Sequence, residues 1–449
     1  MDIKQFLADY VSFPSVSCNR TKVTGMEATR KFLLEFLSQL GFQAREVDTG
    51  LHNIVLAKNK HKKGQRSVLM YGHYDVQPEG DGWSSDPFTL TEKNGRLYGR
   101  GASDNKGGNG TMLAALYDIF TENEKFPLNI TVILEGEEEI GSPSMATFLK
   151  EYRNELQADF AIVADTWSID DENIVITTGL RGIVVLELKL KSAEHDIHSG
   201  YGGSIINPIR ELTKLCTSFH DERGKVNIPG FYDDVEVPSD FELAQTRKLP
   251  FNDNKFLKSI GAKKLSTDKA AYSAIESLRF YPTLEFNGIC GGYIGKGVKT
   301  IIPSEAFAKI TCRLVPNQDC EKIENCIREA VLTRVDKNLE ASLSFEKCSN
   351  AYNLPLNMIL SDQTSPIYRG LRIAEQEIES VFGNKPLYLR DGGSIPLIRT
   401  VKDVLGMESI LIGFSSAEDR IHAADESISV RMLERGREFF RRFLTKLSQ

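Results

Sequence analysis

Four strand ends in the N-terminal part of the sequence are each expected to deliver an acid or a histidine. The residues are His73 and Asp75 after VLMYG, Asp104 in the loop GRGASDNKGG, Glu138 and Glu139 after ITVILEG, and Asp165 after FAIVA. In an open α/β sheet, ligands bind outside the carboxyl ends of the strands. Histidine together with several carboxylates, and without cysteine, is a ligand set suited to zinc, manganese or cobalt. The pattern therefore predicts a metal site.

Each of these residues, taken alone, has an ordinary structural explanation. A single histidine after a strand is more often structural than a ligand, and an acidic run such as Glu137 to Glu139 is typical of a solvated face. Asp104 could close a turn on its own backbone, and Asp165 could cap the following helix. The joint pattern favours the metal site, and the glycines around these residues allow tight turns and close backbone approach.

Motifs of several other enzyme classes are missing from the sequence. It has no GxxxxGK[ST] run, and residues 99–108 lack the GxGxxG spacing of a dinucleotide site. It also has no GxSxG elbow of a serine hydrolase. The net charge of -7 at pH 7 argues against general nucleic-acid binding and against an anionic membrane surface as a partner.

The elements that must position these residues predict an α/β domain. Helical spacing and β-rich runs predict helices over 26–40, 107–120 and 143–152, and strands over 53–57, 67–71, 129–134 and 160–164. Strands that alternate with helices imply a largely parallel sheet.

After Gly179 the pattern changes to that of a smaller α+β domain. Residues 183–190 alternate between apolar and polar, which is typical of a half-exposed sheet. We expect a helix over 205–220, a strand over 306–315 and a helix over 319–335, and we leave 221–282 unassigned. The α/β pattern returns at about residue 352, with helices over 365–381 and 427–447 and a strand over 409–412. We therefore predict a catalytic domain of residues 1–178 and 352–449, with an inserted domain of residues 179–351.

The N-terminal segment and the cysteines indicate in which cellular compartment the protein is expected. The segment MDIKQFLADYVSF carries charges where a signal peptide needs an apolar run, and no apolar run approaches the roughly 18 residues that span a bilayer. The seven cysteines are odd in number, scattered and without a CxxC pair. We therefore expect free thiols and a cytoplasmic protein without a membrane partner.

Several segments together carry a family resemblance. They are YGHYDVQP (71–78), DGWSSDPFTLTEKNGRLYGRGASDNKGG (81–108), LEGEEEIGS (134–142), HDIHSG (195–200), CRLVPNQ (312–318), DGGSIP (391–396) and the late His422. In this order they resemble the di-zinc carnosinase/aminoacylase superfamily of metallopeptidases, and most of all its cytosolic dipeptidase branch. The resemblance implies a zinc-exopeptidase-type α/β catalytic domain, with a mixed, largely parallel sheet flanked by helices. It also implies that the inserted α+β domain is ferredoxin-like and acts as a lid and dimerisation domain.

The resemblance implies a set of metal ligands. Two Zn²⁺ ions per subunit would be held by His73, Asp104 and Asp165, and by Asp104, Glu139 and His422. The same nitrogen and oxygen ligands also bind Mn²⁺ or Co²⁺. Asp75 would orient the imidazole of His73 from behind. The peptide bond after Asp104 is expected to be cis.

The same resemblance implies the cleavage of amide bonds in dipeptides or other small peptides. Two cations would lower the pKa of a bridging water, and Glu138 would act as the general base that takes its proton. His198, reaching over from the inserted domain of the other subunit of a homodimer, would stabilise the oxyanion. Arg313 would hold a substrate carboxylate. The substrate pocket would also be lined by Gly392, Gly393 and Ser394.

Two alternatives stay open. An N-acyl-amino-acid deacylase or desuccinylase would use the same metal chemistry on another acyl group, and a non-catalytic homologue would act as a binding protein. The second is disfavoured because all five ligand positions and Glu138 are present. Asp425 stands where the family commonly has asparagine. Its charge could shift the metal preference or repel acidic substrates.

Overall fold

The computed structural model describes residues 1–18, 23–266, 273–393 and 395–449. The chain divides into two compact units. The first consists of Met1–Thr178, Leu354–Leu389 and Thr400–Gln449, and the second of Gly179–Asn353 and Arg390–Arg399. The sequence prediction put all of 352–449 into the catalytic domain, whereas Arg390–Arg399 groups with the second unit. One contact within that unit is the hydrogen bond from the backbone N–H of Arg181 to the carbonyl oxygen of Gly393, at 2.8 Å.

The first unit is built on a mixed sheet. Its strands are β1 (Gln43–Val47), β2 (Ile54–Lys58), β3 (Ser67–His73), β6 (Asn129–Glu135), β7 (Phe160–Val163), β8 (Val175–Leu180) and β17 (Ser409–Ile412). They lie in the order β1-β2-β6-β3-β7-β17-β8. The pairs β6–β3, β3–β7 and β7–β17 are parallel, and the outer pairs are antiparallel. Two short strands, β15 (Tyr352–Asn353) and β16 (Leu387–Arg390), pair with β8.

The central strands of this sheet explain why their ends meet. Every residue of β6 is buried, as expected for a strand that is covered on both faces. Because β3, β6 and β7 run parallel, their carboxyl ends lie at one edge, and His73 pairs in register with Glu135. The predicted α/β fold with a largely parallel centre is confirmed.

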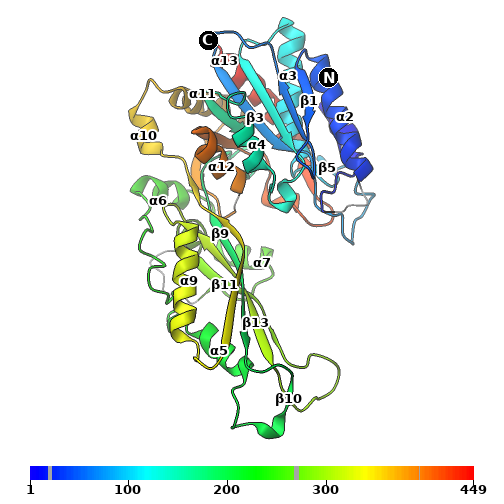
Figure 1. Ribbon diagram of the computed structural model, residues 1–449. Helices are drawn as coiled ribbons and strands as arrows, with labels where there is room; N and C mark the ends of the chain where they lie inside the picture. The colour runs from blue at the N-terminus through cyan, green and yellow to red at the C-terminus, as the bar shows by residue number, and fades with distance from the viewer. Residues whose placement is uncertain (19–22, 267–272, 394) are drawn as a thin grey trace. The chain divides into compact units, whose positions relative to one another are not determined.

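Helices and a small second sheet complete the first unit. The helices are α1 (Ile3–Val11), α2 (Val23–Gln39), α3 (Lys106–Asn123), α4 (Met145–Glu151), α10 (Leu356–Ser361), α11 (Pro366–Phe382) and α13 (Val430–Leu447). Helix α2 lies beside β1, and α3 packs against α13 (Figure 1). Residues 427–429, predicted as the start of the last helix, instead form β18 (Ser427–Ser429), which pairs with β5 (Arg96–Tyr98) next to β4 (Thr91–Lys93). None of the helices in the described ranges has the length and apolar character needed to cross a bilayer.

The second unit is centred on an antiparallel sheet. Its strands are β9 (Gly182–Lys191), β11 (Thr283–Gly291), β13 (Glu305–Leu314) and β14 (Glu340–Ser349), and its two main helices are α5 (Pro208–Thr217) and α9 (Cys320–Arg334). The strand order is β11-β13-β9-β14. With the chain order β9-α5-β11-β13-α9-β14, this is the ferredoxin-like arrangement. Alternate residues of β9 and β13 are buried in one core with both helices, which confirms the predicted α+β domain.

In the stretch 221–282, left unassigned by the sequence, the described residues form three short helices. They are α6 (Asp240–Arg247), α7 (Asp253–Ser259) and α8 (Ala274–Phe280). Serine capping boxes at Ser239 and Ser273 start α6 and α8. The remaining elements are β10 (Ile197–His198), β12 (Ile301–Ile302), α12 (Pro396–Leu405) and the 3₁₀-helices η1 (Glu138–Ile140), η2 (Ser199–Tyr201) and η3 (Ala417–Asp419).

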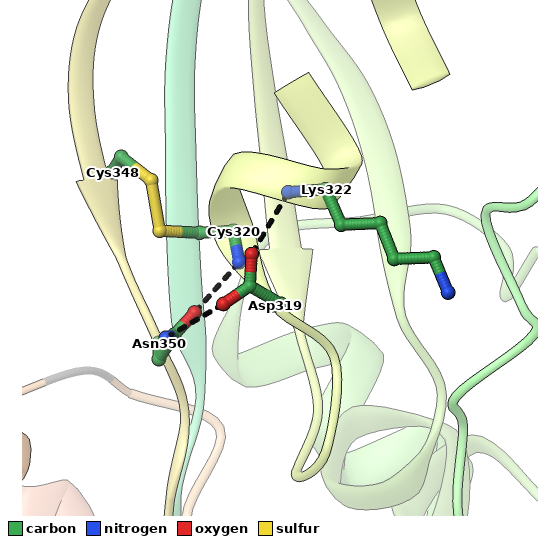
Figure 2. The surroundings of a disulfide bond; sticks show 5 residues. All are labelled: Asp319, Cys320, Lys322, Cys348 and Asn350. Atoms are coloured by element: carbon green, nitrogen blue, oxygen red, sulfur yellow. Dashed lines mark hydrogen bonds between the residues drawn. A yellow bond between two sulfur atoms is a disulfide. The ribbon is translucent and has the colours of Figure 1, made fainter. Parts of the chain in front are cut away.

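A disulfide bond in the second unit contradicts the expectation of free thiols throughout. Cys320 at the start of α9 is bonded to Cys348 in β14, with their Cα atoms 5.7 Å apart. Figure 2 shows the surroundings: Asn350 accepts a hydrogen bond from the backbone N–H of Cys320 at 2.6 Å, and Asp319 caps α9 through Lys322. The two cysteines are 28 residues apart, so only the packing of α9 against β14 brings them together. The other cysteines are free: Cys18, Cys216, Cys290, Cys312 and Cys326.

Candidate metal centre

His73 ends strand β3, and its side chain is fully buried. Its Nδ1 atom lies 3.3 Å from a carboxylate oxygen of Asp75, and its Nε2 atom lies 3.2 Å from Asp104. Because Asp75 occupies the Nδ1 side, Nε2 is the nitrogen directed at the other acids. This is the usual arrangement by which a second carboxylate fixes the orientation of a ligating imidazole.

Asp75 also holds the loop that follows β6. The backbone N–H groups of Glu138 and Glu139 donate to its two carboxylate oxygens, at 3.3 and 3.0 Å. These residues begin the 3₁₀-helix η1. One buried carboxylate therefore positions both the imidazole of His73 and the backbone of Glu138 and Glu139.

Asp104 lies in the loop between β5 and α3, and its peptide bond to Asn105 is cis, as the family resemblance implied. Its two carboxylate oxygens face different partners. Oδ1 lies 3.2 Å from Nε2 of His73, and Oδ2 lies 2.9 Å from Nε2 of His422. The carboxylate of Asp104 is therefore shared between two clusters of side chains.

The clusters coincide with the two predicted ligand sets. In the first, His73, Asp104 and Asp165 offer ligand atoms that all lie within 4.8 Å of one another. In the second, Asp104, Glu139 and His422 do the same, and Nε2 of His422 is 3.3 Å from Glu139. The structure thus brings together five side chains that are spread over 350 positions of the sequence.

The chemistry of these side chains fits divalent cations. Imidazole nitrogens and carboxylate oxygens are the ligands that zinc, manganese and cobalt share. The Oε1 atom of Glu139 is buried and has no hydrogen-bond partner among the described residues, although Gln77 donates to its Oε2 atom at 2.8 Å. A buried carboxylate oxygen without a donor is costly unless a cation completes it.

The charges of the cluster shift the pKa values of its members strongly. Burial raises the pKa of Glu138 well above its usual range, and the charges of Asp165 and Asp104 raise it further against the opposing effect of His73. Hydrogen bonds to Asp104 and Glu139 raise the pKa of His422 to about 10. The cluster therefore favours added positive charge, which is the condition for binding cations.

Several positioning residues were not predicted from the sequence. Asn105 donates to the carbonyl oxygen of Ala164 at 2.9 Å and to a carboxylate oxygen of Asp165 at 2.5 Å. Asn109 donates to the carbonyl oxygen of His73, and a Cβ atom on Gly72 would lie 1.7 Å from the side-chain oxygen of Asn109. A side chain at position 72 would therefore displace the amide group of Asn109. Asn105 lies within the quoted segment 81–108 and Asn109 directly follows it, but their roles depend on which strand end lies beside α3.

The remaining predicted site residues lie in the second unit. His198 is exposed in β10, and its Nδ1 atom accepts a hydrogen bond from the backbone N–H of Gly200. Arg313 is half-buried in β13, and this burial lowers its pKa. Gly392 and Gly393 belong to the loop between β16 and α12. Ser394 lies outside the described residues.

Residues 69–446 match the peptidase family M20/M25/M40. The chain belongs to this family of metallopeptidases. The match covers both ligand clusters and the whole second unit, so it includes the residues whose geometry is given above.

Individual relatives are similar over nearly the full length. The chain is 29% identical to the Cys-Gly metallodipeptidase dug1 of Schizosaccharomyces pombe, over 98% of this chain and 94% of that protein. Its fold is similar to that of human carnosine dipeptidase 1, with a TM-score of 0.78 and 26% identity, covering 100% of this chain and 97% of that one. It is also similar to an M20 family metallo-carboxypeptidase from Sulfolobus solfataricus, with a TM-score of 0.86 and 28% identity, covering 100% of this chain and 99% of that one.

Proposed function

We propose that this metallopeptidase cleaves dipeptides or other small peptides and uses two divalent cations to do so. Zinc is the first candidate for both cations. The observation that carries the proposal is the carboxylate of Asp104, which belongs to both ligand clusters. His73 and Asp165 would complete the first site, and Glu139 and His422 the second. Three protein ligands per cation leave room for a water molecule, as in catalytic zinc sites.

The chain's own residues supply the proton transfers. When bound, the two cations would lower the pKa of a water molecule and polarise the scissile carbonyl group. Glu138, held through its backbone N–H by Asp75, would accept the proton of the attacking water and deliver it to the leaving amine. The burial that raises the pKa of Glu138 suits a group that must both take up and release a proton.

The substrate class rests on the relatives. The similar proteins named above are described as a Cys-Gly metallodipeptidase and a carnosine dipeptidase, which supports a dipeptide substrate here. Arg313 would hold the substrate carboxylate, because a guanidinium group binds a carboxylate with two parallel hydrogen bonds. The loop of Gly392, Gly393 and Ser394 would line the same pocket.

We further propose a homodimer in which His198 serves the site of the partner subunit. The second unit carries exposed apolar side chains that support such an interface: Ile294 is 84% and Val298 is 92% exposed. Both lie between β11 and β12, and Ile301 of β12 pairs with His198. Large exposed apolar patches mark protein–protein contacts.

A cytoplasmic location is the last part of the proposal. The free thiols support it, whereas the bond between Cys320 and Cys348 opposes it, because disulfides are rare in that compartment. Alkylation of thiols in intact cells, followed by mass spectrometry, measures the state of these two cysteines. If Cys320 and Cys348 were oxidised in all molecules of this protein in the cell, a cytoplasmic location would be contradicted.

Metal analysis and a substrate panel test the proposed reaction. The purified protein is expected to hold two divalent cations per chain, to lose activity on chelation and to regain it when zinc, manganese or cobalt is added. It is expected to hydrolyse dipeptides faster than N-acetyl and N-succinyl amino acids. Activity on the acylated compounds alone would identify a deacylase, and a protein that binds no cation would contradict the metal centre itself.

The homodimer has a separate test. If His198 acts across the interface, variants His198→Ala and Glu138→Ala are each inactive, but a mixture that exchanges subunits regains activity. In the mixed dimer, one site combines an intact Glu138 with an intact His198 of the partner. A monomer by sedimentation, or a mixture that stays inactive despite exchange, would contradict this arrangement.

A further inference from the structure

The carboxylate of Glu426 is fully buried beside the metal centre and belongs to neither ligand cluster. It accepts four hydrogen bonds from one loop. Arg100 and the backbone N–H of Gly101 donate to Oε2 at 2.7 and 3.1 Å. The backbone N–H groups of Ser103 and Asp104 donate to Oε1, both at 3.0 Å.

The loop that surrounds Glu426 is the one that carries Asp104. Three of its backbone N–H groups converge on this one carboxylate, and the last of them belongs to Asp104 itself. The backbone N–H of Gly99 adds a fifth contact by donating to the carbonyl oxygen of Glu426 at 2.9 Å. The path of residues 99–104 is therefore set by hydrogen bonds to a residue more than 300 positions away.

Glu426 also ends the loop that carries His422. In this loop Arg420, His422 and Asp425 all have positive φ angles, of 56°, 64° and 60°. Residues other than glycine adopt this left-handed conformation at a cost, so the surrounding contacts must hold them there. Glu426 follows these residues directly and fixes the end of the loop.

The charge of Glu426 is already compensated within this arrangement. Its partner Arg100 is 1% exposed in the side chain, stacks on the ring of Trp83 at 5.4 Å, and also donates to the carbonyl oxygen of Pro78. The pair is a buried carboxylate and guanidinium with several further hydrogen bonds, the condition under which a buried ion pair is tolerated. Glu426 thus offers the cations no free charge, and its contribution is geometric.

We infer that Glu426 is a positioning residue of the metal centre, which joins the Asp104 loop to the His422 loop and so sets the geometry of the second cation site. The inference rests on the proposed function, because it presupposes that these clusters bind cations. Asp104 and His422 are both members of the second cluster, and Glu426 is bonded to the backbone of one and lies four residues beyond the other.

Metal titration of Glu426→Gln tests the inference without any turnover assay. The amide group would place a donor against backbone N–H donors and would loosen the loop. Loss of such an outer contact costs about 10- to 100-fold in metal affinity. We expect zinc affinity at one of the two sites to fall by this factor, measured by competition with a chromophoric chelator, while the other site changes less.

Glu377→Gln is the matched control. Glu377 is also a buried glutamate of the first unit, 1% exposed, but it lies on α11 and is paired with Lys446 of α13, away from both loops in the sequence. It is expected to alter thermal stability without altering either zinc affinity. If both variants weaken zinc binding equally, the effect of Glu426 is general destabilisation and the inference is wrong.

A second variant covers the case in which Glu426→Gln does not fold. Glu426→Asp keeps the charge but shortens the side chain by one methylene group, and it is expected to weaken the same site to a smaller degree. Wild-type affinity at both sites in every folded variant would overturn the inference and leave the proposed function intact. Failure of the wild-type protein to bind zinc would instead overturn the proposed function.

Discussion

Asp425 accepts two hydrogen bonds from Ser84, one from the backbone N–H at 2.7 Å and one from the hydroxyl group at 2.9 Å. Its φ angle of 60° is left-handed, a conformation that aspartate and asparagine tolerate better than most residues. The carboxylate also lies 3.8 Å from Arg420 and is not a member of either ligand cluster. The charge of Asp425 is therefore engaged by Ser84 and by Arg420.

Asp425 is predicted to support the fold and not the choice of metal. Asp425→Asn keeps an oxygen that accepts from the backbone of Ser84 and keeps the left-handed backbone, so kcat/KM and the order of preference among zinc, manganese and cobalt are expected to stay close to wild type. Asp425→Ala removes both hydrogen bonds and is expected to lower the thermal stability of the metal-free protein. A change of preferred metal in Asp425→Asn would mean that the charge acts on the cations after all.

Glu138 is predicted to move protons without binding the cations. Glu138→Gln is expected to lower kcat by a factor of about 10² to 10⁴, the usual contribution of a general base. The metal content, measured by mass spectrometry of the metals, is expected to stay at two per chain because Glu138 belongs to neither cluster. Turnover near the wild-type rate would rule out this role.

Asp104 and Asp165 are predicted to differ in how many cations they hold. Because the carboxylate of Asp104 is common to both clusters, Asp104→Asn is expected to weaken both cation sites. Asp165→Asn removes a ligand from the first cluster only, so one cation is expected to remain bound with nearly unchanged affinity. Titration with zinc separates the two cases, and equal losses in both variants would contradict the shared position of Asp104.

The disulfide is predicted to stabilise the second unit alone. In the chain-entropy estimate, a bridge that closes a loop of 28 residues contributes roughly 3–4 kcal/mol of unfolding free energy. Replacing Cys320 and Cys348 by alanine is expected to lower the melting temperature under oxidising conditions and to leave zinc binding unchanged. Cys290→Ser, which alters a free thiol, is the control. Under reducing conditions the double variant and the wild type are expected to converge, and a difference that persists would point to lost packing.

Arg181 is predicted to hold the segments that surround Arg313. Its guanidinium group donates to the carbonyl oxygens of Leu278, Tyr281 and Arg313, and its backbone N–H donates to that of Gly393. It is 8% exposed, and this burial, together with the charge of Arg313, lowers its pKa to about 10. Arg181→Ala is expected to raise KM for dipeptides more than it lowers kcat, because the guanidinium contacts to the backbone of Leu278, Tyr281 and Arg313 are lost.

A matched arginine separates this effect from general destabilisation. Arg334 also donates to backbone carbonyl oxygens, those of Ser218 and Asn227, within the same unit. Arg334→Ala is expected to lower stability with KM unchanged, and Arg181→Lys is expected to recover part of the loss. Equal KM values for Arg181→Ala and wild type would remove Arg181 from substrate positioning.

Local patterns in the sequence predicted a metal site, and the family resemblance added His422 and the division into two ligand sets. His73, Glu139 and Asp165 each follow a run of buried strand residues, and the parallel register of β3, β6 and β7 then brings their ends to one edge. Helices with clear apolar spacing were placed within a few residues of their observed bounds, as at α9 and α11. Secondary structure could not be assigned to residues 221–282 from the sequence. The helices α6, α7 and α8 are short and largely polar, so their apolar residues show little helical spacing.

Contacts between distant segments were beyond the reach of the sequence. Residues 427–429 continue a helical pattern, but pairing with β5 makes them a strand. No sequence motif around Cys320 and Cys348 predicts the disulfide bond between them. The bond depends on the packing of α9 against β14.

The sequence by itself therefore determined the candidate ligands, because ligand chemistry resides in residue types, in the strand ends that carry most of them, and in the ordered motifs that the family resemblance matches. The tertiary structure alone decided how those residues are held. Glu426 stands out neither by type nor by spacing, and its role exists only because the loop of Asp104 folds around it. The physical reason is that a hydrogen bond between segments more than 300 residues apart produces no periodic pattern of residue types in either segment.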